Sequence, residues 1–249
     1  MRLLVTSLAL LIASAHAADP PKLVLQITVD QLRGDLPARV YDRLGEGGFR
    51  YLLDNGVVYR DAHHAHANTE TIVGHTTLAT GAHPSVHGMV GNLWFDREAG
   101  VTTYNVEDGN YRLLTEGADV DEDAEIDPTQ RAARSEGRSP AAILVTTFSD
   151  ELAAATNGKA KIIGVSVKDR GAISMAGHAG TAYWFSKPTG EFVTSTYYLD
   201  DYPTWVTDFN AAEPARAYAN TSWTLLQEQD TYLFGASDDR AWEADVAGF

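Results

Sequence analysis

Short apolar runs separated by helical patterns constrain the fold of this chain most. Lys22 to Val29 (KLVLQITV) is rich in β-branched residues and ends in Asp30, which is typical of a strand buried on both faces of a parallel sheet. A helical pattern at about 35–55 is closed by Gly56, and a second strand-like run follows at 57–59. This βαβ rhythm predicts an α/β fold, a three-layer α/β/α sandwich.

Later segments continue the alternation. Helical patterns return at 73–79 and 140–156, and the second is followed by an apolar strand at 162–167. The segments at 93–106 and 183–198 are predicted to be hairpins. The acidic stretch at 116–137 is predicted to be a surface loop, and residues 215–249 have no clear period. We find no internal repeat and no composition break that would mark a linker.

The N-terminus has the pattern of a secretory signal peptide. MRLLVTSLALLIASAHAADP places Arg2 before an apolar run and small residues, Ala15 and Ala17, at the spacing that a signal peptidase reads. We expect cleavage after Ala17, which divides the chain into a signal peptide at 1–17 and one domain at 18–249. The apolar run is short for a membrane span, so a secreted or periplasmic protein without a membrane anchor is expected.

Composition excludes several classes of partner and site. Cysteine is absent, so disulfides and thiolate metal ligands are excluded. The formal net charge of -15 disfavours nucleic acids and anionic membranes, which would be repelled, so no nucleic-acid-binding surface is expected. An anionic substrate would need local cations or metal ions that reverse the field at its site.

Two clusters invite a metal-binding interpretation. Within residues 61–87 lie an aspartate and six histidines, but no zincin pattern is present, and histidines also serve as hydrogen-bonding residues in loops: Asp61, His63, His64, His66, His75, His83 and His87. Asp119, Asp121 and Asp123 have the first spacings of a calcium loop, but Ala124 replaces its glycine and Gln130 its glutamate. A solvated acidic loop is the expected outcome for the second cluster.

The most informative stretch is 67–92, ANTETIVGHTTLATGAHPSVHGMVGN. Together with LVLQITVDQLRGD before it and GNLWFD, IGVSVKDRGAI, AGHAGTAYWF and YPTWVTDFN after it, this stretch resembles the alkaline phosphatase superfamily. The resemblance is closest to the threonine-nucleophile alkaline phosphatases related to nucleotide pyrophosphatase/phosphodiesterases. It extends from about Lys22 to Phe209.

The resemblance implies roles for individual residues. Thr71, in the T-x-T segment, corresponds to the nucleophile that becomes phosphorylated, and metal coordination would activate its otherwise weakly nucleophilic hydroxyl. Asp30 corresponds to a metal ligand that shares a metal with Thr71. Asn92 corresponds to an amide that donates to a phosphoryl oxygen. Lys168 and Arg170 correspond to a pair found in the phosphate monoesterases and absent from the diesterases.

The implied substrates are therefore small phosphate monoesters, since two cations would balance the extra charge that a monoester carries and a diester lacks. The implied cofactor is a pair of zinc ions, for which Asp30 and Thr71 supply only part of the ligand set. Residues 211–249 contain no histidine that could complete it. We therefore expect this chain to be the N-terminal part of a longer phosphatase.

Two alternatives remain for its function. They are a phosphodiesterase or nucleotide pyrophosphatase, and an inactive truncated remnant. Sequence indicates no physiological substrate or oligomeric state.

Overall fold

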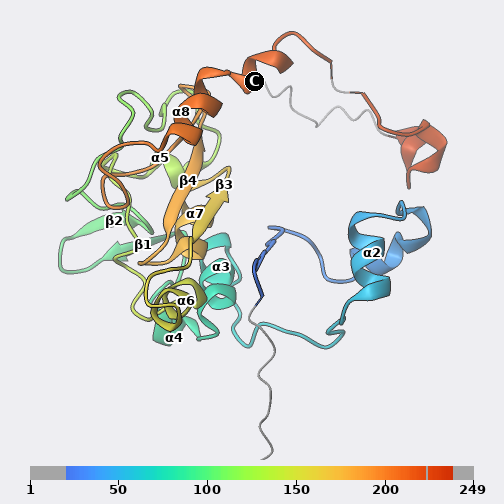
Figure 1. Cartoon of the computed structure of the whole chain (residues 1–249), viewed down its shortest axis with the longest axis horizontal. Helices are drawn as coiled ribbons and strands as arrows, with labels where there is room; N and C mark the ends of the chain where they lie inside the picture. The colour runs from blue at the N-terminus through green and yellow to red at the C-terminus, as the bar shows by residue number, and fades with distance from the viewer. Residues whose placement is uncertain (1–20, 223, 238–249) are drawn as a thin grey trace, which may run out of the picture. The chain divides into compact units, whose positions relative to one another are not determined.

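The computed structural model describes residues 21–222 and 224–237 and is shown in Figure 1. Contacts divide the chain into two units, residues 1–32 and residues 33–249, which are described separately. The predicted signal peptide at 1–17 lies outside the described residues. Among the residues that are described, no helix is both long and apolar enough to cross a membrane.

The predictions of strands at 22–29 and 57–59 are wrong, because neither segment pairs with a strand that the structure describes. The side chains of the first segment are largely exposed, with Leu23 at 77% and Leu25 at 72%. A strand is stable only when neighbouring strands satisfy its backbone groups and cover its apolar face. Composition indicated the strand propensity of these segments but could not supply their partners.

The helix predicted at 35–55 is divided into α1 (Leu36–Arg39), a 3₁₀ turn η1 (Tyr41–Arg43) and α2 (Gly48–Asn55). Glycines cause the interruption before α2, because Gly45, Gly47 and Gly48 lower helix propensity and Gly48 adopts a φ of +58°. α2 ends at Asn55 and Gly56 is its C-cap residue, as predicted.

A mixed sheet forms the centre of the second unit. β3 (Ile163–Ser166) is parallel to β4 (Thr181–Ser186), and β4 is antiparallel to β5 (Glu191–Val193). Helix α7 (Asp169–Ala176) connects the two parallel strands and packs against both, and α3 (Thr71–Thr80) packs against α7. The α/β class, the strand within 162–167, the helix at 73–79 and the hairpin within 183–198 are confirmed.

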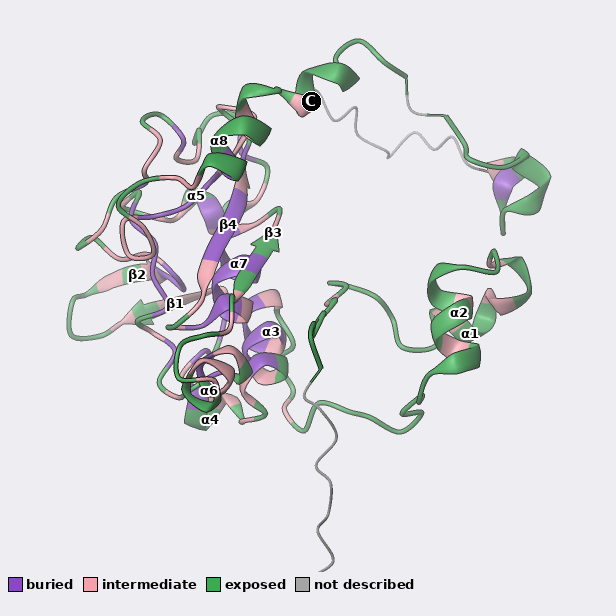
Figure 2. Cartoon of the chain, in the orientation of Figure 1, coloured by how far each residue is buried: buried purple, intermediate pink, exposed green. Residues whose placement is uncertain are grey.

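Burial differs between the strands, as Figure 2 shows. β4 is buried along most of its length, whereas Ile163 and Val165 of the edge strand β3 are 52% and 59% exposed. The apolar core combines residues of α3, α7, β2, β4 and β5 with residues of the connecting segments, and these members have the lowest exposure: Ile72, Val73, Met89, Tyr104, Ala172, Ile173, Ala176, Ala182 and Val193. The core therefore lies where α3 and α7 meet the sheet.

Shorter elements surround this centre. β1 (Leu93–Asp96) and β2 (Val101–Tyr104) form the hairpin predicted at 93–106. The remaining described elements are α4 (Pro84–His87), α5 (Pro128–Arg131), α6 (Phe148–Ala155), α8 (Thr204–Ala211) and the 3₁₀ turns η2 (Pro214–Tyr218), η3 (Gln229–Thr231) and η4 (Gly235–Ser237).

Two predictions about these elements need correction. The helix predicted at 140–156 begins only at Phe148, because the side chain of Thr147 accepts a hydrogen bond from the Asp150 backbone and caps the helix there. The acidic stretch at 116–137 is not only a surface loop, since it contains α5 and buries Glu125 and Gln130.

Asp150 connects α6 to the end of α7. Its Oδ1 accepts hydrogen bonds of 2.8 Å from the backbone N–H groups of both His178 and Ala179, and its Oδ2 accepts one of 2.7 Å from Thr147 N. This arrangement requires Gly177, which has a φ of +66° and on which a Cβ would lie 2.1 Å from Thr147 Oγ1. Burial alone would raise the pKa of Asp150, but these hydrogen bonds and that from His178 lower it.

We expect Asp150→Asn to reduce the free energy of unfolding by about 3 kcal/mol at neutral pH, because it breaks a buried, charge-assisted network. Since the folded-state pKa is lowered, the carboxylate contributes stability above the unfolded pKa of about 4 and loses it as the pH falls through the folded-state value. Chemical denaturation at several pH values measures both effects. The exposed neighbour provides the control Glu151→Gln, and equal losses in the two variants would contradict the assignment.

Candidate active site

Thr71 is the first residue of α3, directly after the N-cap residue Glu70. Two hydrogen bonds attach this helix start to Asn92. The backbone N–H of Ile72 donates to Asn92 Oδ1 over 3.2 Å, and the backbone N–H of Asn92 donates to Glu70 Oε2 over 2.5 Å. The structure therefore brings together Thr71 and Asn92, which are far apart in sequence.

The position of Asn92 is fixed from both sides. Its carbonyl oxygen accepts a hydrogen bond of 2.7 Å from Asn105 Nδ2, and a Cβ on the preceding Gly91 would lie 2.9 Å from Leu93 O. Because the amide oxygen of Asn92 already accepts from Ile72, its NH₂ group is the end that can donate to a ligand. An N–H donor beside a helix N-terminus is suited to an anion.

Lys168 and Arg170 lie where β3 passes into α7. Lys168 is the N-cap residue of α7, and its side chain is 38% exposed, whereas that of Arg170 is 3% exposed. Both cations bind Oδ2 of Asp127, Arg170 through Nη2 at 3.0 Å and Lys168 through Nζ. The two cations thus lie close together, at the carboxyl end of a parallel strand, where α/β sheets commonly bind ligands.

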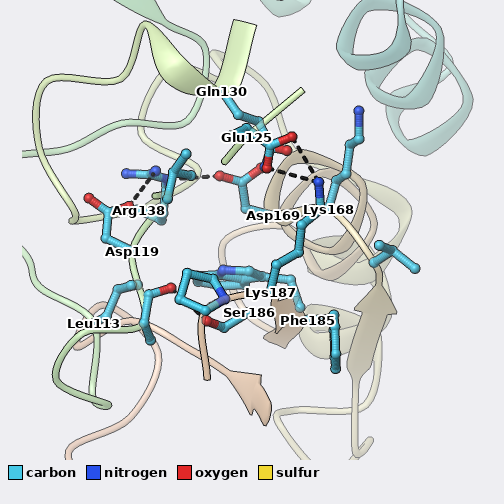
Figure 3. Close-up of a pocket in the computed structure, with 15 residues that line it drawn as sticks. Leu113, Asp119, Glu125, Gln130, Arg138, Lys168, Asp169, Phe185, Ser186 and Lys187 are labelled. Carbon is cyan, nitrogen blue, oxygen red and sulfur yellow. Dashed lines mark hydrogen bonds and ion pairs between the residues drawn. The ribbon is translucent and has the colours of Figure 1, made fainter. Parts of the chain in front are cut away.

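Asp169 stands between the two cations in the sequence, but its side chain is buried in the interior. Its Oδ1 accepts a hydrogen bond of 2.6 Å from the Tyr104 hydroxyl. Its Oδ2 accepts one of 2.7 Å from Arg138 Nε, as Figure 3 shows. Arg138 also donates to Asp119 over 3.2 Å. Burial, and then the charge of Asp169, raise the pKa of Tyr104 well above its usual range.

Contacts between α3 and α7 connect the two halves of the site. Within α3, His75 Nδ1 donates to the Thr71 carbonyl oxygen over 2.8 Å. On α7, a Cβ on Gly171 would lie 2.6 Å from Ser166 Oγ and 3.9 Å from His75 Nε2. The glycine therefore allows α7 to approach both β3 and α3 closely. Thr71 begins one helix of this packed pair, with Asn92 hydrogen-bonded to its first turn, and Lys168 and Arg170 lie at the start of the other.

Asp30, the predicted metal ligand, does not follow a strand in the structure. It is exposed and begins a turn in the first unit, where its Oδ1 accepts a hydrogen bond of 3.1 Å from Gln31 N. The turn bends sharply because Gln31 adopts a φ of +58°.

Two histidines of the cluster, His75 and His87, form local hydrogen bonds. His87 is buried, accepts a hydrogen bond from Met89 N over 3.1 Å and contacts Thr77 Oγ1 through Nε2. Its pKa is lowered by burial and by His66 nearby. Within 21–222 and 224–237, no group of three or more His, Cys, Asp or Glu could hold a metal ion. The described residues therefore do not fit a two-zinc ligand set.

The acidic series behaves largely as expected. Asp121 and Asp123 are exposed, and the Asp123 backbone donates to Asp121 Oδ1 over 3.0 Å. Asp119 instead forms the ion pair with Arg138.

Several residues of the site were not predicted. Asp127 could have been found, because Asp127, Pro128 and Thr129 have the pattern of an N-cap followed by a proline at the first helical position. Glu70, which accepts the hydrogen bond from the Asn92 backbone, could have been proposed as a site residue because it is adjacent to Thr71 in the sequence. The buried contacts of Tyr104 and Arg138 with Asp169 join residues distant in sequence, and no local pattern indicates them.

Comparison with known proteins identifies the family. The sequence matches the family described as Type I phosphodiesterase / nucleotide pyrophosphatase over residues 24–240. The chain therefore belongs to this family, and the resemblance inferred from its motifs is confirmed.

Its relatives include alkaline phosphatases. The chain is 39% identical to alkaline phosphatase PafA of Elizabethkingia meningoseptica and 38% identical to alkaline phosphatase PhoV of Synechococcus elongatus, in each case over 92% of its length. The crystal structure of wild-type PafA matches with a TM-score of 0.70 and 38% identity over 81% of this chain. The match covers 36% of the PafA structure, and the chain spans 39% of the length of PafA or PhoV.

Proposed function

We propose that the complete protein carrying this chain is a phosphoric monoester hydrolase with Thr71 as its nucleophile. The observation that carries the proposal is the start of α3, where Thr71 begins the helix and Asn92 is bound beside it. Family membership and the alkaline phosphatase relatives support the reaction class.

In the proposed reaction, Thr71 Oγ loses its proton to solvent and forms a bond to phosphorus as the ester P–O bond breaks. The leaving oxygen departs with the electron pair and gains a proton from solvent. Water then forms a bond to phosphorus as the P–Oγ bond breaks, and Thr71 regains its proton as phosphate is released. The N-terminus of α3 and the Asn92 amide would bind the phosphoryl oxygens. Lys168 and Arg170 would balance the charge of the dianionic monoester.

A second solved PafA structure supports the choice of these four residues. It is the structure of a variant with substitutions at a threonine, an asparagine, a lysine and an arginine. The threonine and asparagine are separated by as many residues as Thr71 and Asn92, and the lysine and arginine, like Lys168 and Arg170, have one residue between them.

Zinc dependence is proposed from the family resemblance alone. Asp30 and Thr71 are the ligands proposed within this chain, and the other ligands of a two-zinc set would belong to the rest of the complete protein. The described residues do not form that set, so the roles derived above are those of the chain's own side chains. Export, with removal of residues 1–17, is also proposed, from the sequence pattern.

The family description also includes phosphodiesterases and nucleotide pyrophosphatases, which act on substrates with less charge on the reacting phosphoryl group. The adjacent cations Lys168 and Arg170 favour monoesters over these substrates, because a buried guanidinium and a nearby ammonium stabilise a dianion more than a monoanion.

Replacing Thr71 by Ala in the complete protein should abolish turnover and the covalent intermediate, because the variant lacks the hydroxyl at the start of α3 that would form the bond to phosphorus. Rapid acid quenching with a labelled aryl phosphate, followed by peptide mapping, measures the intermediate. Thr69→Ala, in the same T-x-T segment, is the matched control. Label trapped on another residue would contradict the assignment.

Replacing Lys168 or Arg170 by Ala should lower kcat/KM for an aryl phosphate at least about tenfold more than for a bis-aryl phosphodiester, since a charge-assisted contact is worth about 1.5–3 kcal/mol. Parallel assays on the two substrates measure the ratio. Equal losses on both would show that the pair does not select monoesters.

Residues 18–249 expressed alone should show little zinc-dependent phosphatase activity, because a catalytic zinc commonly has three protein ligands and the described residues offer no such group. Calorimetric titration of the metal-free chain with zinc, together with an aryl phosphate assay, tests this. Two tightly bound zinc ions with sustained turnover would overturn the expectation.

A further inference from the structure

Asp127 contacts both cations of the candidate site through one oxygen atom. Its Oδ2 accepts hydrogen bonds from Lys168 Nζ and from Arg170 Nη2, the latter over 3.0 Å. Asp169, the acidic residue between the cations in sequence, is engaged instead by Tyr104 and Arg138. Asp127 is thus the carboxylate through which the ammonium and the guanidinium are joined.

The other oxygen of Asp127 is fixed to the backbone of α5. Oδ1 accepts hydrogen bonds of 2.9 Å from Thr129 N and 2.7 Å from Thr129 Oγ1, as an N-cap residue does. Thr129 Oγ1 also accepts a hydrogen bond of 3.0 Å from Arg170 Nη1. The carboxylate and the guanidinium are therefore both attached to the first turn of α5.

The protonation state of Asp127 agrees with this geometry. Burial alone would raise its pKa, but the hydrogen bonds from Lys168 and Thr129 and the charge of Arg170 outweigh burial and hold the pKa well below its usual range. The group is an anion throughout the neutral range. A charged carboxylate with one oxygen fixed can hold two cations at a set separation, which a neutral or mobile group cannot.

We propose that Asp127 is a positioning residue that sets the separation of Lys168 and Arg170 and thereby the preference of the site for dianionic phosphate monoesters. The inference rests on the proposed function. Without Asp127, the flexible Lys168 side chain, 38% exposed, would extend into solvent, and the buried Arg170 would lose its charged partner. A dianion would then have to order both cations on binding.

The decisive variant is Asp127→Asn in the complete protein, because the amide oxygen can still cap α5 through Thr129 while the charge is lost. We expect kcat/KM to fall about tenfold for an aryl phosphate, as for loss of one charge-assisted contact, and to change little for a bis-aryl phosphodiester. In a Lys168→Ala background the same substitution should cause a smaller loss.

The matched control is Glu125→Gln, which removes a carboxylate from the same segment but from an ion pair with Lys187 instead (Figure 3). We expect it to leave the ratio of the two activities unchanged. Competition by inorganic phosphate should be measured on each variant, together with the thermal midpoint.

Two other outcomes of the Asp127→Asn assays would contradict the positioning role. Equal losses on both esters would show that Asp127 only stabilises the fold. A rise in monoester activity with tighter phosphate inhibition would show that Asp127 competes with substrate, and either result overturns the inference. Failure of the proposed function is distinguishable, because Lys168→Ala and Arg170→Ala, which retain Asp127, would then show no monoester-selective loss.

Discussion

The arrangement of the site depends on the buried ion pair between Arg138 and Asp169. Their side chains are 2% and 1% exposed, and removal of either would leave an uncompensated charge in the interior. The pair is completed by hydrogen bonds from the Tyr104 hydroxyl and from the backbone N–H of Arg170 to Asp169. Because Asp169 is the first residue of α7, this network determines where the helix begins and how its two neighbouring cations are presented.

The same network bears on how a strongly acidic protein could present positive charge to the proposed anionic substrate. Asp169 is neutralised within the protein by Arg138, so it does not cancel the field of the cations on either side of it. Asp127 binds those cations at a single oxygen. The two carboxylates next to the cations thus have different functions, one structural and one, as proposed, in positioning.

Sequence predicted those parts of the fold and site that depend on local patterns. The helix of Thr71, the strand before Lys168 and the hairpins were correctly placed, because their hydrophobic periods and turn residues lie within each segment. The strands at 22–29 and 57–59 were not, since pairing is a property of two segments. The four proposed site residues came from family motifs, whereas the contacts of Asp127 and Tyr104 join segments dozens of residues apart, which a single sequence does not reveal.

Helix α7 is fixed at both ends, at Asp169 by the buried ion pair and just beyond Gly177 by Asp150 of α6. A helix held in this way transmits a displacement at one end to the other as a rigid body, because its backbone hydrogen bonds resist bending. Variation at Thr147 or His178, which pack around the far end, therefore bears on how Lys168 and Arg170 are placed. Divergence among related proteins at these supporting positions would then alter the geometry of the site while its four motif residues stay the same.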